Sequence, residues 1–333
     1  MLAAPAGGWL SVAPSTKVED LLASTLAKLV ANDEALLDEL WARYPCEHIY
    51  LDVGTNIGVQ IRKLFEPQKY PKANATHVIY ERFFGPIGAQ SLGTRCRVCA
   101  IGFEPNPHHR ARLVELQARY RAAGVGVLVF AAAASDSDGT TQLALGNANK
   151  KDPWEDLGAS AAESWTAIRR TPTKSDPRRE GLLDTVPVRK VDLSRLVHSI
   201  HRRLAARSPK GRILMKLDVE GLEFALLPAM IRSQALCTIN AMAIEWHTRL
   251  WGRDRAERAA RTLKLSSPAE VGGRALWTLT QTIRDKVREL VGHGQHDCQT
   301  ELLEMDDETY MHDSRAGRVW PTEVLCVPLP RVA

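Results

Sequence analysis

The sequence predicts an α/β fold in which helices cover both faces of a doubly wound, mostly parallel sheet. Strand-like apolar runs alternate with segments of helical period along most of the 333 residues, the pattern of repeated strand–helix units. The last two strand-like runs, 300–307 and 322–330, have no helical segment between them, so we expect them to end the sheet as an antiparallel hairpin. Leucines three and four residues apart over 17–43 predict a helical extension before the first strand.

The first half of the chain is predicted to continue as strand–helix units. The run "HIYLDVG" (48–54) predicts a buried strand, and "VQIRKLF" (59–65) predicts the start of the next helix. Residues 66–96 are rich in Pro, Gly and Asn and are expected to form an insertion with a short element near "THVIYERFFG". The run 97–107 predicts the second strand, and a helix is expected over 109–123. One face of that helix is marked by Leu113, Leu116 and Tyr120.

The second half repeats the alternation around one long interruption. A third strand is expected over 124–135, followed by a turn and a short strand. Residues 147–187 are polar and Pro-rich without a period, which predicts a long loop. The runs 212–221 and 239–247 predict the fourth and fifth strands, with the helix "EFALLPAMIRS" between them. Helical patterns fill 253–291.

Composition limits the classes of function. The net charge is +5, and the basic residues lie in short groups beside acids, which argues against a nucleic-acid-binding surface. No run approaches the roughly 18 apolar residues of a membrane span, and the first residues make a poor signal peptide, so we expect a cytoplasmic protein. We predict a helical extension over 1–45 and one larger domain over 46–333. The oligomeric state stays open.

The cysteines carry no clear metal or disulfide signature. There are six of them: Cys46, Cys96, Cys99, Cys237, Cys298 and Cys326. Cys96 and Cys99 form one CxxC pair, but no second pair follows at the spacing of a zinc ribbon. We therefore expect reduced cysteines packed as small hydrophobic residues, with a disulfide between some of them left open.

The residues that could carry chemistry stand where the predicted strands end. "LDVGTNIG" (51–58) turns through two glycines after Asp52, a pattern that can hold a nucleotide-like ligand at the start of a helix. Later strands end in "GFEPNP", "AAAASDSDGT", "MKLDVEG" and "AIEWH". A dinucleotide fingerprint would need G-x-G-x-x-G, whereas the spacing here is G-x-x-x-G, which argues against a nicotinamide oxidoreductase.

Taken in order, "LDVGTNIG", "GFEPNP", "AAAASDSDGT", "KVDLSRL", "MKLDVEGLEFALLPAM" and "AIEWH" resemble the FkbM-type methyltransferase family over about residues 48–247. The resemblance implies a class I, Rossmann-like methyltransferase fold, S-adenosyl-L-methionine as cofactor, and O-methylation of a hydroxyl on a carbohydrate or small metabolite. The alternative is a non-catalytic, cofactor-binding interaction protein of the same fold. The helical extension, the insertion 66–96 and the loop 147–187 depart from the family, so they leave the acceptor open.

The expected cofactor contacts also have a physical interpretation. The glycines of the first turn let backbone approach the methionine part of the cofactor, whose amino group can donate to Asp52. Glu104 can accept two hydrogen bonds from ribose hydroxyls, and Ser135 or Asp136 can face the adenine amino group. The alternative is that such residues only cap turns. The full expected set is Asp52, Gly54, Thr55, Asn56, Gly58, Glu104, Asn106, Ser135, Asp136 and Asp218.

The fourth and fifth strands carry the candidates for catalysis. Alternation puts Lys216, Asp218 and Glu220 on one face of the fourth strand, and Glu245 and His247 on one face of the fifth. If these strands are neighbours, acids and an imidazole converge at the carboxyl edge of the sheet, where ligands of α/β proteins bind. A carboxylate or a histidine of ordinary pKa can take the proton that an acceptor hydroxyl loses. The expected catalytic set is Asp218, Glu220, Glu245 and His247.

Alternatives at these residues stay open at this point. Glu220 could only cap the following helix, and His247 could only bond backbone. Such a cluster could also hold a divalent ion, but the spacing demands none, so no metal is expected. The insertion and the loop are expected to frame the acceptor, with Trp154 and Trp165 available to stack on a sugar.

Overall fold

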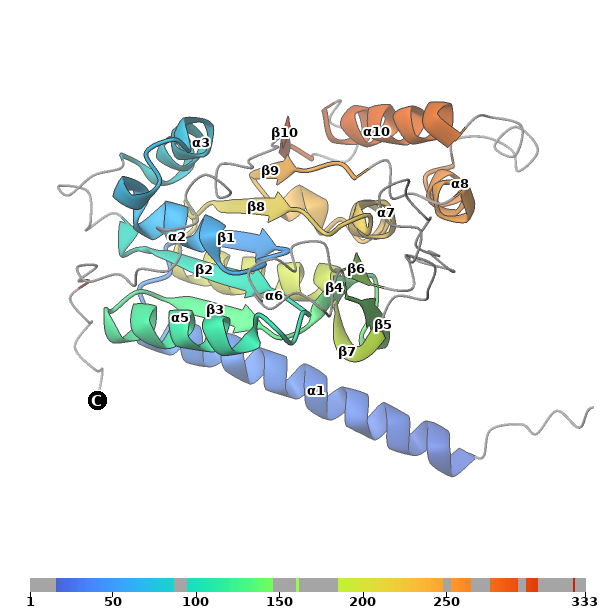
Figure 1. The fold of residues 1–333 in the computed structure, drawn as a ribbon, viewed down its shortest axis with the longest axis horizontal. Helices are drawn as coiled ribbons and strands as arrows, with labels where there is room; N and C mark the ends of the chain where they lie inside the picture. Colours follow the sequence, from blue (N-terminus) through green and yellow to red (C-terminus); the bar gives the residue numbers. More distant parts are fainter. Residues whose placement is uncertain are drawn as a thin grey trace, which may run out of the picture.

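A computed structural model of the chain describes residues 16–86, 95–145, 160–161, 185–247, 253–264, 276–292, 298–304 and 326. In these residues a six-stranded sheet, flanked by helices on both faces, lies beside a smaller four-stranded sheet (Figure 1). No helix in the described part of the chain is long and apolar enough to cross a membrane.

The large sheet is parallel throughout and confirms the doubly wound α/β prediction. Its strand order is β10-β9-β8-β1-β2-β3, and each neighbouring pair runs parallel. The chain order reverses between β1 and β8, so these two strands form the topological switch point at which ligands of such sheets bind. The strands are β1 His48–Val53, β2 Val98–Phe103, β3 Val127–Phe130, β8 Ile213–Leu217, β9 Ala241–Ile244 and β10 Glu301–Glu304.

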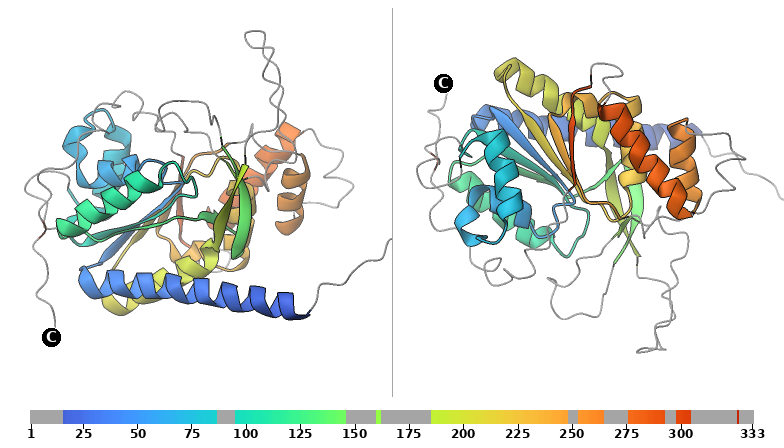
Figure 2. Two further views of the ribbon diagram at one scale, coloured as in Figure 1. Left: turned by 60° about the horizontal axis from the view of Figure 1, so that its bottom comes forward. Right: turned by 90° about the horizontal axis from the view of Figure 1, so that it is seen from above.

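Alternation along β1 divides the core in two. Ile49, Leu51 and Val53 face one cluster with residues of α1, α6 and α7, whereas Tyr50 faces the other with residues of α2, α3 and α5. The two helical layers lie on opposite sides of the sheet (Figure 2). The helices are α1 Thr16–Arg43, α2 Val59–Phe65, α3 Asn74–Phe84, α5 Arg110–Ala122, α6 Leu193–Arg207, α7 Glu223–Arg232, α8 Arg253–Thr262 and α10 Leu276–Gly292, with 3-10 turns η1 Pro67–Lys69 and η5 Leu236–Thr238.

The predicted N-terminal helices are one continuous helix, α1, which is part of the main core. Its C-terminal part and the residue that follows bury Leu37, Leu40, Trp41 and Tyr44 against the sheet and α6. Asp33 of α1 also pairs with Arg195 of α6, at 2.9 Å between Oδ2 and Nη2. The expected boundary between residues 45 and 46 stays a prediction, but hydrophobic burial joins the two sides of it.

The expected third strand is two strands in two sheets. β3 ends at Phe130 in the large sheet, and Ala131 and Ala132 carry the chain into β4, which pairs with β7. Ser135 therefore ends a strand of the small sheet, with Asp136 directly after it. The expectation that the two residues end the third strand of the large sheet is wrong. The small sheet has the order β4-β7-β5-β6. Its strands are β4 Ala133–Ser135, β5 Gly139–Ala144, β6 Ser160–Ala161 and β7 Thr185–Asp192.

The expected C-terminal hairpin does not agree with the placement of Cys326. β10 pairs with β9 and is parallel to it. Cys326, the one described residue of the expected last strand, donates its backbone N–H to Ala123 O, before β3 at the opposite edge of the sheet. The rest of 322–330 lies outside the described residues.

The expectation of reduced cysteines is wrong. All six form disulfides: Cys46–Cys99, Cys96–Cys326 and Cys237–Cys298. The partners are 53, 230 and 61 residues apart along the chain. Such pairings depend on the tertiary fold, which is why the spacing of the cysteines did not reveal them.

Candidate active site

The turn after β1 touches the end of β8, at the switch point of the sheet. Asp218 donates its backbone N–H to Val53 O at 2.9 Å. Gly54 has φ +89°, and a Cβ there would lie 1.7 Å from Asp218 O. Asn56 and Gly58 also have positive φ, 52° and 85°. The backbone thus needs a glycine at position 54 so that the two strand ends can meet.

Thr55 holds this turn against β2. Its hydroxyl donates to Asp52 O at 2.7 Å and accepts from the backbone N–H of Phe103 at 2.9 Å. Gly102 leaves the space for it, since a Cβ there would lie 2.4 Å from Thr55 Oγ1. The Thr55 side chain therefore positions the expected cofactor turn through bonds inside the protein.

Asp52 lies at the bottom of the site. It is fully buried and stands beside Lys216 of β8 in the sheet register. Its Oδ1 accepts from the Tyr50 hydroxyl at 3.4 Å, whereas its Oδ2 has no hydrogen-bond partner. Burial raises the pKa of Asp52 to about 7, although Lys216 acts in the opposite direction. The buried acceptor without a partner is what a cationic or N–H-bearing ligand group would satisfy.

Glu104 joins the first two strand ends. Its Oε2 accepts the backbone N–H of Asn56 at 2.7 Å, and its Oε1 accepts that of Asn106 at 2.8 Å. Near it, Asn56 Oδ1 and both ring nitrogens of His109 are buried without a hydrogen-bond partner. His109 is 3% exposed and lies 3.7 Å, Nδ1 to Oε1, from Glu104. The sequence pattern did not single out His109, whose available signal was its place two residues after "FEPNP".

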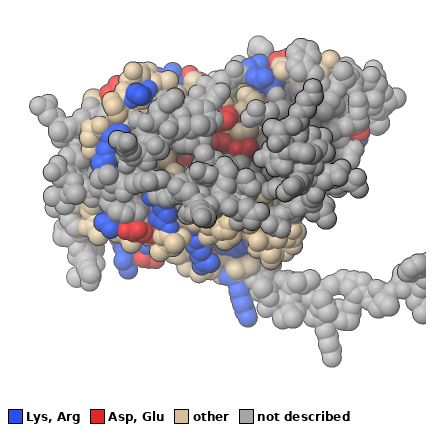
Figure 3. Space-filling model, viewed as in Figure 1, with Lys and Arg blue, Asp and Glu red and all other residues tan. Residues whose placement is uncertain are grey.

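The acids of β8 and β9 meet around one imidazole, as the alternation predicts. β8 and β9 are neighbours, and His247 Nε2 lies 3.6 Å from Asp218 Oδ1, 3.7 Å from Glu220 Oε2 and 3.3 Å from Glu245 Oε1. Lys216 Nζ pairs with Asp218 Oδ2 at 2.5 Å. We call Asp218, Glu220, Glu245 and His247 the acid–histidine cluster. Acidic atoms gather in a recess near the ends of these strands (Figure 3).

Glu223, the first residue of α7, is a partner of the acid–histidine cluster that the sequence pattern did not single out. It is fully buried, and His247 Nδ1 lies 2.7 Å from its Oε1. The same oxygen accepts the backbone N–H of Gly221 at 3.3 Å. Glu220 has φ 50°, and the N-cap position of α7 is occupied by Leu222, two residues later. The second acid of "EGLE" was the available signal.

The carboxylates around His247 shift its pKa away from the ordinary value that the sequence analysis expected. Burial alone would lower the pKa of His247, but the nearby carboxylates of Glu223 and Glu245 outweigh it and raise that pKa to about 11. The raised pKa favours the imidazolium form of His247 and argues against its role as the base, so a carboxylate is the better candidate. Burial raises the pKa of Glu220 to about 7. Burial also opposes the charge of Lys216, yet Asp218 and Asp52 raise its pKa.

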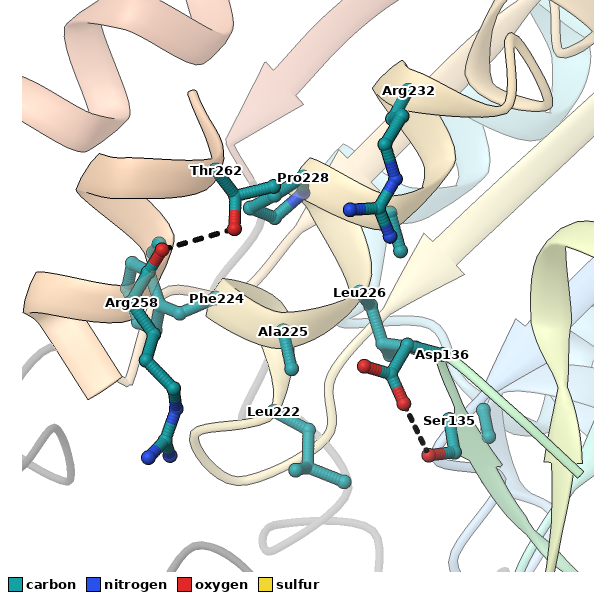
Figure 4. A pocket seen from close by; sticks show the side chains of 13 residues that line it. Ser135, Asp136, Leu222, Phe224, Ala225, Leu226, Pro228, Arg232, Arg258 and Thr262 are labelled. Atoms are coloured by element: carbon teal, nitrogen blue, oxygen red, sulfur yellow. Dashed lines mark hydrogen bonds between the residues drawn. The ribbon is translucent and has the colours of Figure 1, made fainter. Parts of the chain in front are cut away.

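Ser135 and Asp136 line a separate pocket of about 340 Å³ between β4, α7 and α8 (Figure 4). Ser135 Oγ donates to Asp136 Oδ1 at 3.3 Å, and Leu222 and Ala225 face them from α7. Leu222, directly before α7, thus lines this pocket, and the next residue, Glu223, contacts His247 of the acid–histidine cluster. In the described residues, no hydrogen bond joins Ser135 or Asp136 to Glu104.

The residues expected to frame the acceptor are described in part. The insertion 66–96 contains η1 and α3, and α3 packs Tyr80 and Phe84 into the core. Most of the loop 147–187, with Trp154 and Trp165, lies outside the described residues.

Comparison with protein families relates the whole of this site to one of them. The model of the Methyltransferase FkbM domain matches residues 52–290 of the chain, from Asp52 through His247 and α8. Searches of curated proteins and of solved structures return no match to the chain.

Proposed function

Because the chain belongs to the FkbM methyltransferase family, we propose that it transfers a methyl group from S-adenosyl-L-methionine to a hydroxyl oxygen of a carbohydrate or another small metabolite. The observation that carries the proposal is the meeting of two strand ends. The glycine turn after β1, with its buried Asp52, lies directly against the end of β8, which bears the acid–histidine cluster.

The residues of the first turn fit this cofactor. When bound, S-adenosyl-L-methionine supplies an electrophilic methyl group on a sulfonium. Asp52 Oδ2 and Asn56 Oδ1 are buried polar atoms without partners, suited to accept from the amino group of the amino-acid part. Glu104 uses its oxygens for two backbone N–H groups, and a carboxylate keeps further acceptor capacity for ribose hydroxyls. Adenine contacts of Ser135 and Asp136 stay a prediction.

The acid–histidine cluster supports oxygen as the atom that is methylated. A hydroxyl that attacks a methyl group must lose its proton, and a carboxylate within hydrogen-bond reach can take it. Asp218, Glu220 and Glu245 are 22–28% exposed at their side chains, so they can meet a ligand. Lys216 and the imidazolium of His247 hold Asp218 from two sides.

A sugar or similar polyol suits a site with several carboxylates, because each can accept from a separate hydroxyl. The non-catalytic alternative has no support in the described residues, since the cofactor turn and the cluster are both complete there. The expected cytoplasmic location fits poorly with three disulfides, which persist mainly in oxidising compartments. We infer that the protein folds in such a compartment.

Two measurements test the proposed function. Calorimetry should show binding of S-adenosyl-L-methionine to the wild type and weaker binding to Glu104→Ala. Transfer of labelled methyl should then be screened against fractionated carbohydrates and small metabolites. Asp218→Asn should lower turnover about a hundredfold, the worth of a positioned acid–base group, and cofactor affinity must be measured alongside because Asp218 also belongs to the expected cofactor contacts. Absence of cofactor binding, or transfer only to nitrogen or carbon, would refute the proposal.

A further inference from the structure

We propose that the acid–histidine cluster binds one divalent transition-metal ion, Mn²⁺ or Zn²⁺, through Asp218, Glu220 and His247, with Glu245 beside the ion. Donor atoms of Asp218, Glu220 and His247 lie within 4.8 Å of one another, the one such group of three among the described residues. This inference goes beyond the proposed methyl transfer, which assigns no metal ion to these residues. Binding of the ion can be measured without cofactor or acceptor.

The spacing of the donor atoms suits a shared cation better than hydrogen bonds. Ligands about 2.1 Å from an ion lie about 3.0 Å apart in octahedral and about 3.4 Å apart in tetrahedral geometry. His247 Nε2 lies 3.3, 3.6 and 3.7 Å from the oxygens of Glu245, Asp218 and Glu220. All three distances exceed the roughly 2.9 Å of a good N–H···O bond. A single N–H cannot serve three carboxylates, whereas one cation between them can.

The orientation of His247 is an independent sign of a metal ligand. The imidazole is 5% exposed, and its Nδ1 bonds the fully buried Glu223 at 2.7 Å. A ligand histidine typically donates its other ring N–H to such a carboxylate, which fixes the ring and its tautomer. Glu223 thus aims Nε2 at the three remaining carboxylates. Lys216 occupies Asp218 Oδ2, and Oδ1 faces the cluster.

Charge and donor type select the class of ion. Four carboxylates, of Asp218, Glu220, Glu223 and Glu245, surround one imidazole, and Lys216 pairs with the first of them. An added divalent cation would offset this excess, and it would replace the proton at Nε2. Carboxylates alone would suit Mg²⁺ or Ca²⁺, but the imidazole favours a transition ion. Glu220 and Glu245, 28% and 23% exposed at their side chains, leave an entry path.

The test is a titration of metal-free full-length protein with Mn²⁺, followed by the electron paramagnetic resonance signal of the free ion. We expect one bound Mn²⁺ per chain and its displacement by Zn²⁺. Glu220→Gln and Asp218→Asn should each weaken Mn²⁺ binding at least tenfold. The matched control is Asp138→Asn, a partly buried, ion-paired carboxylate of the small sheet, which should bind as the wild type does.

Thermal unfolding checks that each variant is folded, and cofactor calorimetry separates this proposal from the proposed function. No binding of Mn²⁺ or Zn²⁺ to the wild type would overturn the site. Binding equal to that of the wild type in both ligand variants would place the ion elsewhere and overturn the site as well. Binding of Mg²⁺ or Ca²⁺ without Mn²⁺ or Zn²⁺ would overturn the assigned class of ion.

Discussion

Burial of the Asp52 carboxyl group should lower the stability of the fold, and the same group is a candidate to bind a ligand. It is fully buried, and one of its oxygens has no partner. Burial raises its pKa from the ordinary 3.8 to about 7. Below pH 3.8 the residue is protonated in both states. As the pH rises to about 7, the unfolded chain loses this proton first. Stability contributed by Asp52 therefore falls through this window, by on the order of 4 kcal/mol for a shift of about three units.

Asp52→Asn should remove this dependence, because an amide does not titrate. Between pH 4 and 8 the free energy of unfolding of the variant should rise relative to that of the wild type, while affinity for S-adenosyl-L-methionine falls. Chemical denaturation across this range, with calorimetry, measures both. Asp138→Asn is the control: burial alone would raise the pKa of Asp138, but Arg195 outweighs it and lowers that pKa below the ordinary 3.8. Asp138 therefore titrates below this range in both states, and its variant should differ from the wild type by an amount that does not depend on pH. A pH-independent difference for Asp52→Asn would contradict the raised pKa.

At the scale of elements, the site depends on the contact between the β1 turn and the end of β8. Gly54→Ala would add both a Cβ 1.7 Å from Asp218 O and the strain of φ +89°, the strain alone costing about 1–3 kcal/mol. We expect a much lower melting temperature and loss of cofactor binding. Gly139→Ala separates the two effects, because φ is +147° but the nearest atom is Lys190 Cε at 3.4 Å. Equal losses in both variants would show that the contact contributes nothing.

Local periodicity predicted most of the helices and strands, and it predicted that four residues of the candidate site lie together. Alternation along β8 and β9 was enough to bring Asp218, Glu220, Glu245 and His247 together, because side chains of neighbouring parallel strands share faces. Glu223 escaped because its contact depends on how α7 docks. The run of four alanines at 131–134 gave no signal for the change of sheet. The pKa of His247 likewise reflects carboxylates that only the tertiary fold assembles.

In the whole molecule, the disulfides and the candidate active site lie at opposite ends of the parallel strands of the large sheet. Cys46, Cys96 and Cys99 lie before or near the start of β1 and β2, and Cys237 and Cys298 lie before β9 and β10. Cys326 meets the chain before β3. Because the strands are parallel, the disulfides gather at the amino edge, whereas Asp52 and the acid–histidine cluster lie at the carboxyl edge.

This separation predicts that the disulfides govern stability without shaping the site. Alkylation of the unfolded, unreduced protein should label no cysteine, and after reduction it should label all six.

Each disulfide bond should stabilise the folded state by roughly 2–4 kcal/mol. The Cys96–Cys326 bond closes 230 residues and Cys237–Cys298 closes 61, so the entropic model makes the longer one more stabilising by about 1 kcal/mol. Paired serine variants of each bond, compared by denaturation, measure this difference. Cofactor affinity of the folded fraction should stay unchanged in both pairs, because neither bond reaches the carboxyl edge. Labelling of the unreduced chain would instead show free thiols, and it would contradict the inference that the protein folds in an oxidising compartment.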